Sequence, residues 1–389
     1  MLARVLSLVW KKPVACAKAF ATVSSMIFLT TFKYIFQGPP VASWTLKTNL
    51  IRDFIRLFLS SGPEFNSIVL DLTSVGSFDS GQRVAKLDGG IATRFDIPSV
   101  PWRDKHLENS GIWGDKLVEI AAASMERQMN GECVIADEAM LPNTDVVNNL
   151  PNGKVVLHFH GGAYVLGTMD SYRKMHLILS KATGLPVYGF AYRLAPESQY
   201  PTQLYDAFCA FEYLRGMGVR EQDIIFSGDS AGGNLALSLW LLLKPNISGM
   251  VLLSPRVDVT SNRDSWRRNA KADYLAPYNV YNTSNCIRLL LGPSRPVDAE
   301  MLSWLSDPFV ASVHADFTGL PPTLVQAGTA EAMYDDITLF ANRTHQQTGQ
   351  LRFQTYPDEV HVFQGFPGMA HTQQALDAIW GFVQSLQAP

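Results

Sequence analysis

The stretch Ile224-Ile225-Phe226-Ser227-Gly228-Asp229-Ser230-Ala231-Gly232 decides the fold of this chain. Its apolar start predicts a buried strand, and the apolar residues at 234–244 predict a helix, so Ser230 lies at a strand-to-helix turn. Glycine two residues before and after the serine leaves room for neighbouring backbone in so tight a turn. The pattern predicts a nucleophile elbow. The alternative is a glycine-rich loop at a helix start, because G-x-S-x-G often arises by chance.

A serine hydroxyl becomes a good nucleophile only when a base takes its proton, and a carboxylate usually orients that base. The chain has eight histidines. We predict His361 as the base, because it follows a strand-like run at residues 351–356 and precedes a final amphipathic helix. We interpret four other histidines as ordinary surface or capping residues: His106, His314, His345 and His371.

The acid should follow the strand that precedes the histidine. The run at residues 323–327 predicts this strand, and Glu331 lies in the loop after it, so we predict Glu331 as the acid. Asp335 and Asp336 are the alternatives. They fall in the first turn of the next predicted helix, where a carboxylate is expected because it offsets the helix dipole.

Acyl transfer also needs backbone N–H donors for the oxyanion. His160-Gly161-Gly162-Ala163-Tyr164 follows an apolar strand at residues 154–159 and is the candidate loop. We predict Gly161, Gly162 and Ala231, the residue after the serine, as the donors. His160 is expected to brace this loop by hydrogen bonding, and the alternative reading is a plain Gly-Gly turn.

Taken together, these blocks resemble the hormone-sensitive-lipase family of α/β-hydrolases. The resemblance also rests on Tyr192-Arg193-Leu194-Ala195-Pro196-Glu197 and on Ser254-Pro255 with Asp258, and it covers about residues 154–386. It implies an α/β fold with an eight-stranded, mostly parallel sheet and a helical cap. Within the family the pattern is similar to a fungal membrane-associated branch that includes sterol deacetylases. The chain departs from the family at Glu331-Ala332, where many members have Asp-Pro, and at Arg256, where an aromatic residue is common.

The chain of 389 residues is expected to contain an N-terminal membrane-anchor or cap segment at 1–60 and a catalytic domain at 61–389. Strand and helix patterns alternate from residue 154, which indicates a parallel sheet. Residues 91–97 and 133–136 are the candidate first strands. We expect a cap insertion at about 256–308, whose aromatic residues either shape the pocket or belong to the core.

The first sixty residues differ from the rest, because residues 1–60 hold eight Lys or Arg and the single acid Asp53. Residues 19–32 carry no charge, and as a helix residues 14–36 would span ~34 Å, enough to cross a bilayer. No small-residue cleavage site follows, which argues against a removed signal. Residues 49–60 predict a second amphipathic helix. The alternative is that both helices pack over the active site as a cap.

Net charge is −3 with no basic stripe, so we expect no nucleic-acid partner. The four cysteines form no CxxC pair, and we expect neither a metal site nor a cofactor. Three triplets match glycosylation acceptors: Asn246-Ile247-Ser248, Asn282-Thr283-Ser284 and Asn342-Arg343-Thr344. About two such triplets are expected by chance, so they favour a lumenal domain only mildly. The expected location is a membrane, that of the endoplasmic reticulum.

These features predict a serine esterase that removes a short acyl group, acetyl above all, from a hydrophobic alcohol such as a sterol, terpenoid or polyketide. Two alternatives remain open. One keeps Ser230, Glu331 and His361 but transfers the acyl group to an alcohol, forms a lactone or releases a thioester product. The other is a non-catalytic ligand-binding protein on the same fold. The oligomeric state is not predicted.

Overall fold

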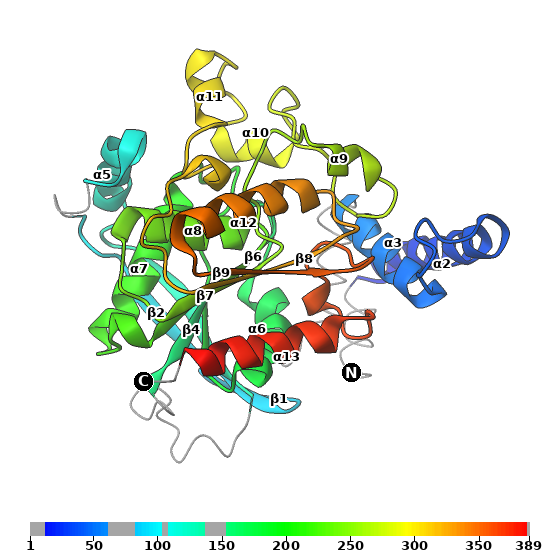
Figure 1. Cartoon of the computed structure of the whole chain (residues 1–389), viewed down its shortest axis with the longest axis horizontal. Helices are drawn as coiled ribbons and strands as arrows, with labels where there is room; N and C mark the ends of the chain where they lie inside the picture. The colour runs from blue at the N-terminus through cyan, green and yellow to red at the C-terminus, as the bar shows by residue number, and fades with distance from the viewer. Residues whose placement is uncertain (1–11, 61–81, 103–107, 137–152, 387–389) are drawn as a thin grey trace.

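A mixed sheet forms the centre of the computed structural model, which describes residues 12–60, 82–102, 108–136 and 153–386 (Figure 1). The sheet has nine strands in the order β1-β2-β3-β5-β4-β6-β7-β8-β9. Their bounds are β1 Val84–Leu87, β2 Gly90–Pro98, β3 Gln128–Ile135, β4 Val155–Phe159, β5 Val187–Phe190, β6 Ile224–Asp229, β7 Gly249–Leu253, β8 Thr323–Gly328 and β9 Leu351–Tyr356.

Most of this sheet is parallel, as the sequence predicts. Strands β5, β4, β6, β7, β8 and β9 pair in parallel, whereas β1, β2 and β3 are antiparallel to their neighbours. The predicted first strands at 91–97 and 133–136 lie in β2 and β3. The sheet has nine strands rather than the expected eight, because Val84–Leu87 pairs with β2 as a short hairpin at the sheet edge.

Helices cover both faces of the sheet. One face packs against α6 (Met169–Thr183) and α13 (Thr372–Ser385), and the other against α7 (Thr202–Gly216), α8 (Ala231–Leu243) and α12 (Tyr334–Thr348). Successive side chains along a strand point to opposite faces of the sheet. Val156 and Ile225 pack against α6 and α13, whereas Leu157 and Phe226 pack on the face covered by α7, α8 and α12. A further helix, α5 (Gly114–Ala123), packs on α7.

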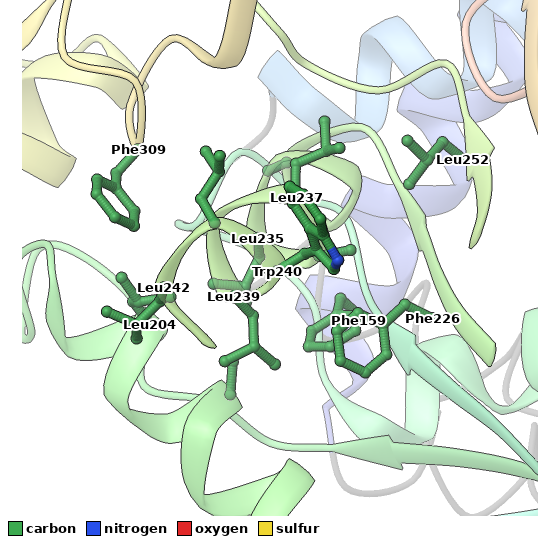
Figure 2. Packing of buried hydrophobic residues seen from close by; sticks show 14 of the residues in the cluster. Phe159, Leu204, Phe226, Leu235, Leu237, Leu239, Trp240, Leu242, Leu252 and Phe309 are labelled. Carbon is green, nitrogen blue, oxygen red and sulfur yellow. The ribbon is translucent and has the colours of Figure 1, made fainter. Parts of the chain in front are cut away.

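The helix after Ser230 is enclosed by apolar side chains (Figure 2). Residues of α8 from Ala231 to Leu242 are buried, and its leucines and Trp240 pack among side chains from the sheet and neighbouring elements. Those neighbours include Phe159, Leu204, Phe226, Leu252 and Phe309. Each fully buried leucine stabilises the fold by about 1.5–3 kcal/mol, so α8 is a rigid support for the turn before it.

The connection from β7 to β8 contains short helices at the predicted cap insertion. They are α9 (Asp264–Arg268), α10 (Cys286–Leu291) and α11 (Ala299–Trp304). Trp266 and Trp304 are buried, whereas Tyr281 is exposed. The two tryptophans therefore belong to the hydrophobic core, which is one of the two roles that the sequence predicts for the aromatic residues of this insertion. Single-turn 3-10 segments occur at Gly111–Trp113, Glu221–Asp223, Ser312–His314 and Phe363–Gly365.

The N-terminal region contains α2 (Pro13–Gln37) and α3 (Leu46–Ser60), which pack on each other at one side of the molecule (blue in Figure 1). Helix α3 is attached to the body, since Arg52 and Arg56 donate hydrogen bonds to backbone carbonyls in residues 270–273. Helix α2 exposes its large apolar side chains: Val14, Phe20, Ile27, Phe28, Leu29, Phe32, Ile35 and Phe36.

By length and composition, α2 could cross a bilayer over Val14–Gln37, with mean hydropathy 1.5 and only 6% of that window buried. A signal sequence near an N-terminus would meet the same criterion. The two helices therefore differ: α3 contacts the body of the molecule at residues 270–273, and α2 presents an apolar surface. The division into an N-terminal segment and a catalytic domain stays a prediction.

Candidate active site

Ser230 lies on a strained turn between β6 and α8, as predicted. Its backbone has φ 52° and ψ −119°, which a residue with a side chain rarely adopts. A Cβ added at Gly228 would overlap the carbonyl of Gly232, and one at Gly232 would overlap that of Phe159. The Ser230 N–H donates to the carbonyl of Leu253 at 3.0 Å. The glycines on either side of the serine are therefore required by close backbone contact.

His361 and Glu331 are joined by a buried hydrogen bond. The Nδ1 atom of His361 lies 3.0 Å from Oε2 of Glu331, and both side chains are at most 3% exposed. A carboxylate only accepts, so Nδ1 carries a proton, and in the neutral imidazole Nε2 keeps its lone pair. Nε2 is buried and has no hydrogen-bond partner among the described residues. A neutral imidazole can accept a proton at this nitrogen, which makes no hydrogen bond to the Ser230 hydroxyl in the described structure.

Burial is the largest single influence on the pKa of His361 and lowers it, whereas the hydrogen bond and the charge of Glu331 raise it. The charges of Asp273 and Asp229 act in the same direction as Glu331, so the net result is a raised pKa. A raised pKa means that the neighbouring carboxylates favour the protonated imidazole.

Ser254 is a site residue whose role the sequence did not reveal. Its hydroxyl donates to Oε1 of Glu331 at 2.7 Å and accepts from the N–H of Val362 at 3.1 Å. It therefore connects the acid loop with the histidine loop. The available signal was its position directly after β7, because the carboxyl ends of parallel strands meet at one edge of the sheet.

The alternative acids bind elsewhere. Asp335 accepts from the N–H of Ser265 at 2.8 Å, and Asp336 accepts from the indole N–H of Trp266 at 2.7 Å. Both lie in the first turn of α12, as expected. Of the other histidines, His345 is near the carbonyl of Leu351, His371 pairs with Glu359, and His314 lies in a 3-10 turn. His106 lies outside the described residues.

The loop after β4 approaches the serine turn, but one predicted donor needs correction. The N–H of Gly161 donates to Oδ1 of Asp229 at 3.0 Å, in a buried position. A single N–H bound to a carboxylate cannot also serve an oxyanion well, so the prediction for Gly161 is replaced by a structural role. Gly162 has φ 108° in this loop, and Ala231 is the first residue of α8, where backbone N–H groups lack helical partners.

His160 braces the loop. Its Nδ1 lies 2.7 Å from the carbonyl of Gly161, and its ring stacks on Tyr192 with centroids 4.0 Å apart. Burial lowers the pKa of His160 to about 4, so the ring is neutral near pH 7. A neutral imidazole beside a carbonyl donates from Nδ1 and holds the loop in place.

The guanidinium of Arg256 is buried and does not face solvent. It is 1% exposed, and its guanidinium donates to Oδ1 of Asn234 at 2.9 Å and lies 4.9 Å from the ring centroid of Tyr164. Asn234 also accepts from the hydroxyl of Tyr164 at 2.9 Å. Arg256 therefore links the loop after β4 to α8. Among the described residues, no cluster of His, Cys, Asp and Glu could hold a metal ion.

Comparisons with known proteins agree with this geometry. The profile of the alpha/beta hydrolase fold family matches residues 156–365. An esterase of Acinetobacter venetianus is 35% identical over 238 residues, covering 60% of this chain and 75% of the relative. An acetyl-hydrolase of Streptomyces hygroscopicus is 27% identical over 239 residues, covering 60% of this chain and 76% of the relative.

Solved structures give the same result. An esterase from the bacterial hormone-sensitive lipase family has a TM-score of 0.65 at 23% identity, covering 89% of this chain and 100% of the other. A hormone-sensitive lipase from a metagenome library has a TM-score of 0.55 at 26% identity, covering 67% and 81%. The chain therefore belongs to the α/β-hydrolase fold family, among its hormone-sensitive-lipase-like carboxylic ester hydrolases.

Proposed function

We propose that Ser230 is the nucleophile, His361 the general base and Glu331 the carboxylate that orients the base. The observation that carries this assignment is the 3.0 Å contact between His361 Nδ1 and Glu331 Oε2, which leaves Nε2 able to accept a proton. Nε2 takes the proton of the Ser230 hydroxyl as Oγ attacks the ester carbonyl. The imidazolium then gives this proton to the leaving alcohol, and water repeats the cycle on the acyl-enzyme.

We assign the oxyanion to the backbone N–H groups of Gly162 and Ala231. With the N–H of Gly161 bound to Asp229, Gly162 remains as the donor from this loop. The buried hydrogen bonds of Gly161 and His160 favour a preformed loop, which stabilises developing charge without reorganisation.

The proposed reaction is removal of a short acyl group, acetyl above all, from a hydrophobic alcohol such as a sterol, terpenoid or polyketide. The similarity to an acetyl-hydrolase supports the short acyl group. The exposed apolar surface of α2 supports an alcohol that partitions into lipid. The resemblance to the fungal membrane-associated branch with sterol deacetylases points to the same substrate class.

We further propose that α2 attaches the enzyme to a membrane, with the endoplasmic reticulum as the expected location. Its length and exposed apolar side chains support attachment. The acceptor triplets at Asn246, Asn282 and Asn342 support a lumenal catalytic domain.

Replacement of Ser230 tests the nucleophile. Ser230→Ala is expected to lower turnover of p-nitrophenyl acetate by ~10⁴-fold or more, because no other group forms the acyl-enzyme. A fluorophosphonate probe should label the parent at Ser230 and leave the variant unlabelled. Equal hydrolysis by the two purified proteins would refute the assignment, and an unlabelled, folded parent would favour a binding protein.

The acid is tested by a pair of isosteric replacements. Glu331→Gln should reduce kcat by ~10³-fold or more, because the amide cannot hold the Nδ1–H tautomer or stabilise the imidazolium. Asp335→Asn is the matched control, and it should retain most activity because Asp335 binds the N–H of Ser265. The opposite ranking in steady-state kinetics would place the acid on α12.

The preferred length of the acyl group is tested with a series of p-nitrophenyl esters of increasing chain length. We expect kcat/KM to be highest for acetate and to fall by ~10-fold or more by octanoate, since a small acyl pocket rejects added methylenes. Incubation with a lipid extract should then release deacylated alcohols. A rate that rises with chain length would instead indicate a long-chain lipase.

Membrane attachment is tested by flotation with phosphatidylcholine vesicles. The triple replacement Phe28→Ser, Leu29→Ser and Phe36→Ser should weaken vesicle binding by ~100-fold or more, because it removes exposed apolar area from α2. Tyr281→Ser removes a similarly exposed aromatic ring outside α2 and should leave binding unchanged. If both variants float like the parent, α2 is not the anchor.

A further inference from the structure

Residues 269–274, which follow α9, contact both loops of the proposed acid–base pair. The side-chain amide of Asn269 donates to the carbonyls of Thr329 at 2.9 Å and Glu331 at 2.7 Å. The hydroxyl of Tyr274 donates to the carbonyl of His361 at 2.6 Å. This segment therefore forms hydrogen bonds with the backbone of both loops, the one that contains Glu331 and the one that contains His361.

Asp273 is at the centre of this segment. Its Oδ2 accepts from the N–H of Ala332 at 2.7 Å, and its Oδ1 accepts from the N–H of Tyr274 at 2.8 Å and from that of His361 at 3.4 Å. The side chain is completely buried. One carboxylate thus binds the residue after Glu331 and the backbone of His361 itself.

Asp273 is a buried carboxylate that lies close to other charged groups. Its pKa is raised to about 6, chiefly by burial; the charge of His361 opposes this rise and that of Glu331 adds to it. Within the described part of the chain, Asp273 forms no ion pair, and the charged groups that face it or His361 are Glu331, Asp229 and Arg56. A buried carboxylate without a fixed counter-ion is unfavourable. Its negative charge is best balanced when His361 is an imidazolium, the state formed during acyl transfer.

We propose that Asp273 is a positioning residue of the ester-hydrolysis step, which aligns the Glu331 and His361 loops and stabilises the imidazolium with a second negative charge. This proposal rests on the proposed function of Ser230, His361 and Glu331. In this proposal two carboxylates act on His361 in different ways. Glu331 fixes the tautomer at Nδ1, whereas Asp273 binds the backbone N–H of His361 and adds a second negative charge.

The test is the pH dependence of ester hydrolysis by Asp273→Asn, which keeps the size of the side chain and removes its charge. Loss of a negative charge near His361 makes the imidazolium less stable, so the acid limb of the kcat/KM profile should move to lower pH by about one unit. We also expect kcat to fall by about 10- to 100-fold with little change in KM, because the loops are less well aligned.

Asp336→Asn is the matched control. Asp336 is also a buried carboxylate with a raised pKa, to about 7, chiefly because of burial, but it binds Trp266 and Arg263 and makes no contact with His361. Its replacement should change thermal stability and leave the acid limb in place. Asn269→Ala, which loosens the same loops without a change of charge, should lower kcat and also leave the acid limb in place.

Thermal melting of each variant identifies any that do not fold, and Asp273→Ser provides a second neutral variant if Asp273→Asn does not. An acid limb that stays at the parent pH in a folded neutral variant would overturn the proposal. So would an equal shift in Asp336→Asn. Fluorophosphonate labelling of the parent distinguishes failure of the Asp273 proposal from failure of the proposed function. If the parent is labelled and active but the acid limb of a neutral Asp273 variant does not move, only the role of Asp273 is refuted. A parent that is neither labelled nor active refutes the proposed function and this inference together.

Discussion

The rest of the site depends on the strained backbone at Ser230. A residue with φ 52° is unfavourable in isolation, and it persists because the elements on both sides are fixed. Before it, β6 is paired between β4 and β7, and after it, α8 is enclosed by apolar side chains. The cost of the turn is thus offset by the burial of a whole helix. The same packing excludes side chains at Gly228 and Gly232, so the backbone and the hydrophobic core specify one conformation together.

Around this turn, the site is assembled from loops at one edge of the parallel sheet. Ser230, Ser254, Glu331 and His361 follow β6, β7, β8 and β9, whose carboxyl ends meet at that edge. Hydrogen bonds connect these loops, both between side chains, as from His361 and Ser254 to Glu331, and from side chains to backbone groups. Ser254 reaches Val362, and Asp273 reaches Ala332 and His361. Such bonds to the backbone fix main-chain position directly, and the orientation of the imidazole that contacts Glu331 depends on that position.

The two N-terminal helices differ in how they contact the rest of the molecule. Arg56 of α3 donates to the backbone at residues 270–273, the segment that contains Asp273. Helix α2 packs on α3 but leaves its apolar side chains exposed. The sequence anticipated both helices, since charge distribution and apolar periodicity are local features. It did not reveal that α3 would bind the segment next to the acid loop, because that contact joins residues far apart in the chain.

The sequence by itself determined the alternation of strands and helices, the turn at Ser230 and the candidates Glu331 and His361. These rest on periodicity, glycine spacing and chain order, which are local properties. Only the tertiary structure decided that the N–H of Gly161 binds Asp229, that Arg256 is buried against Asn234, and that Ser254 and Asp273 connect the loops. The physical reason is that a hydrogen bond depends on distances of about 3 Å between groups whose separation in sequence carries no such information.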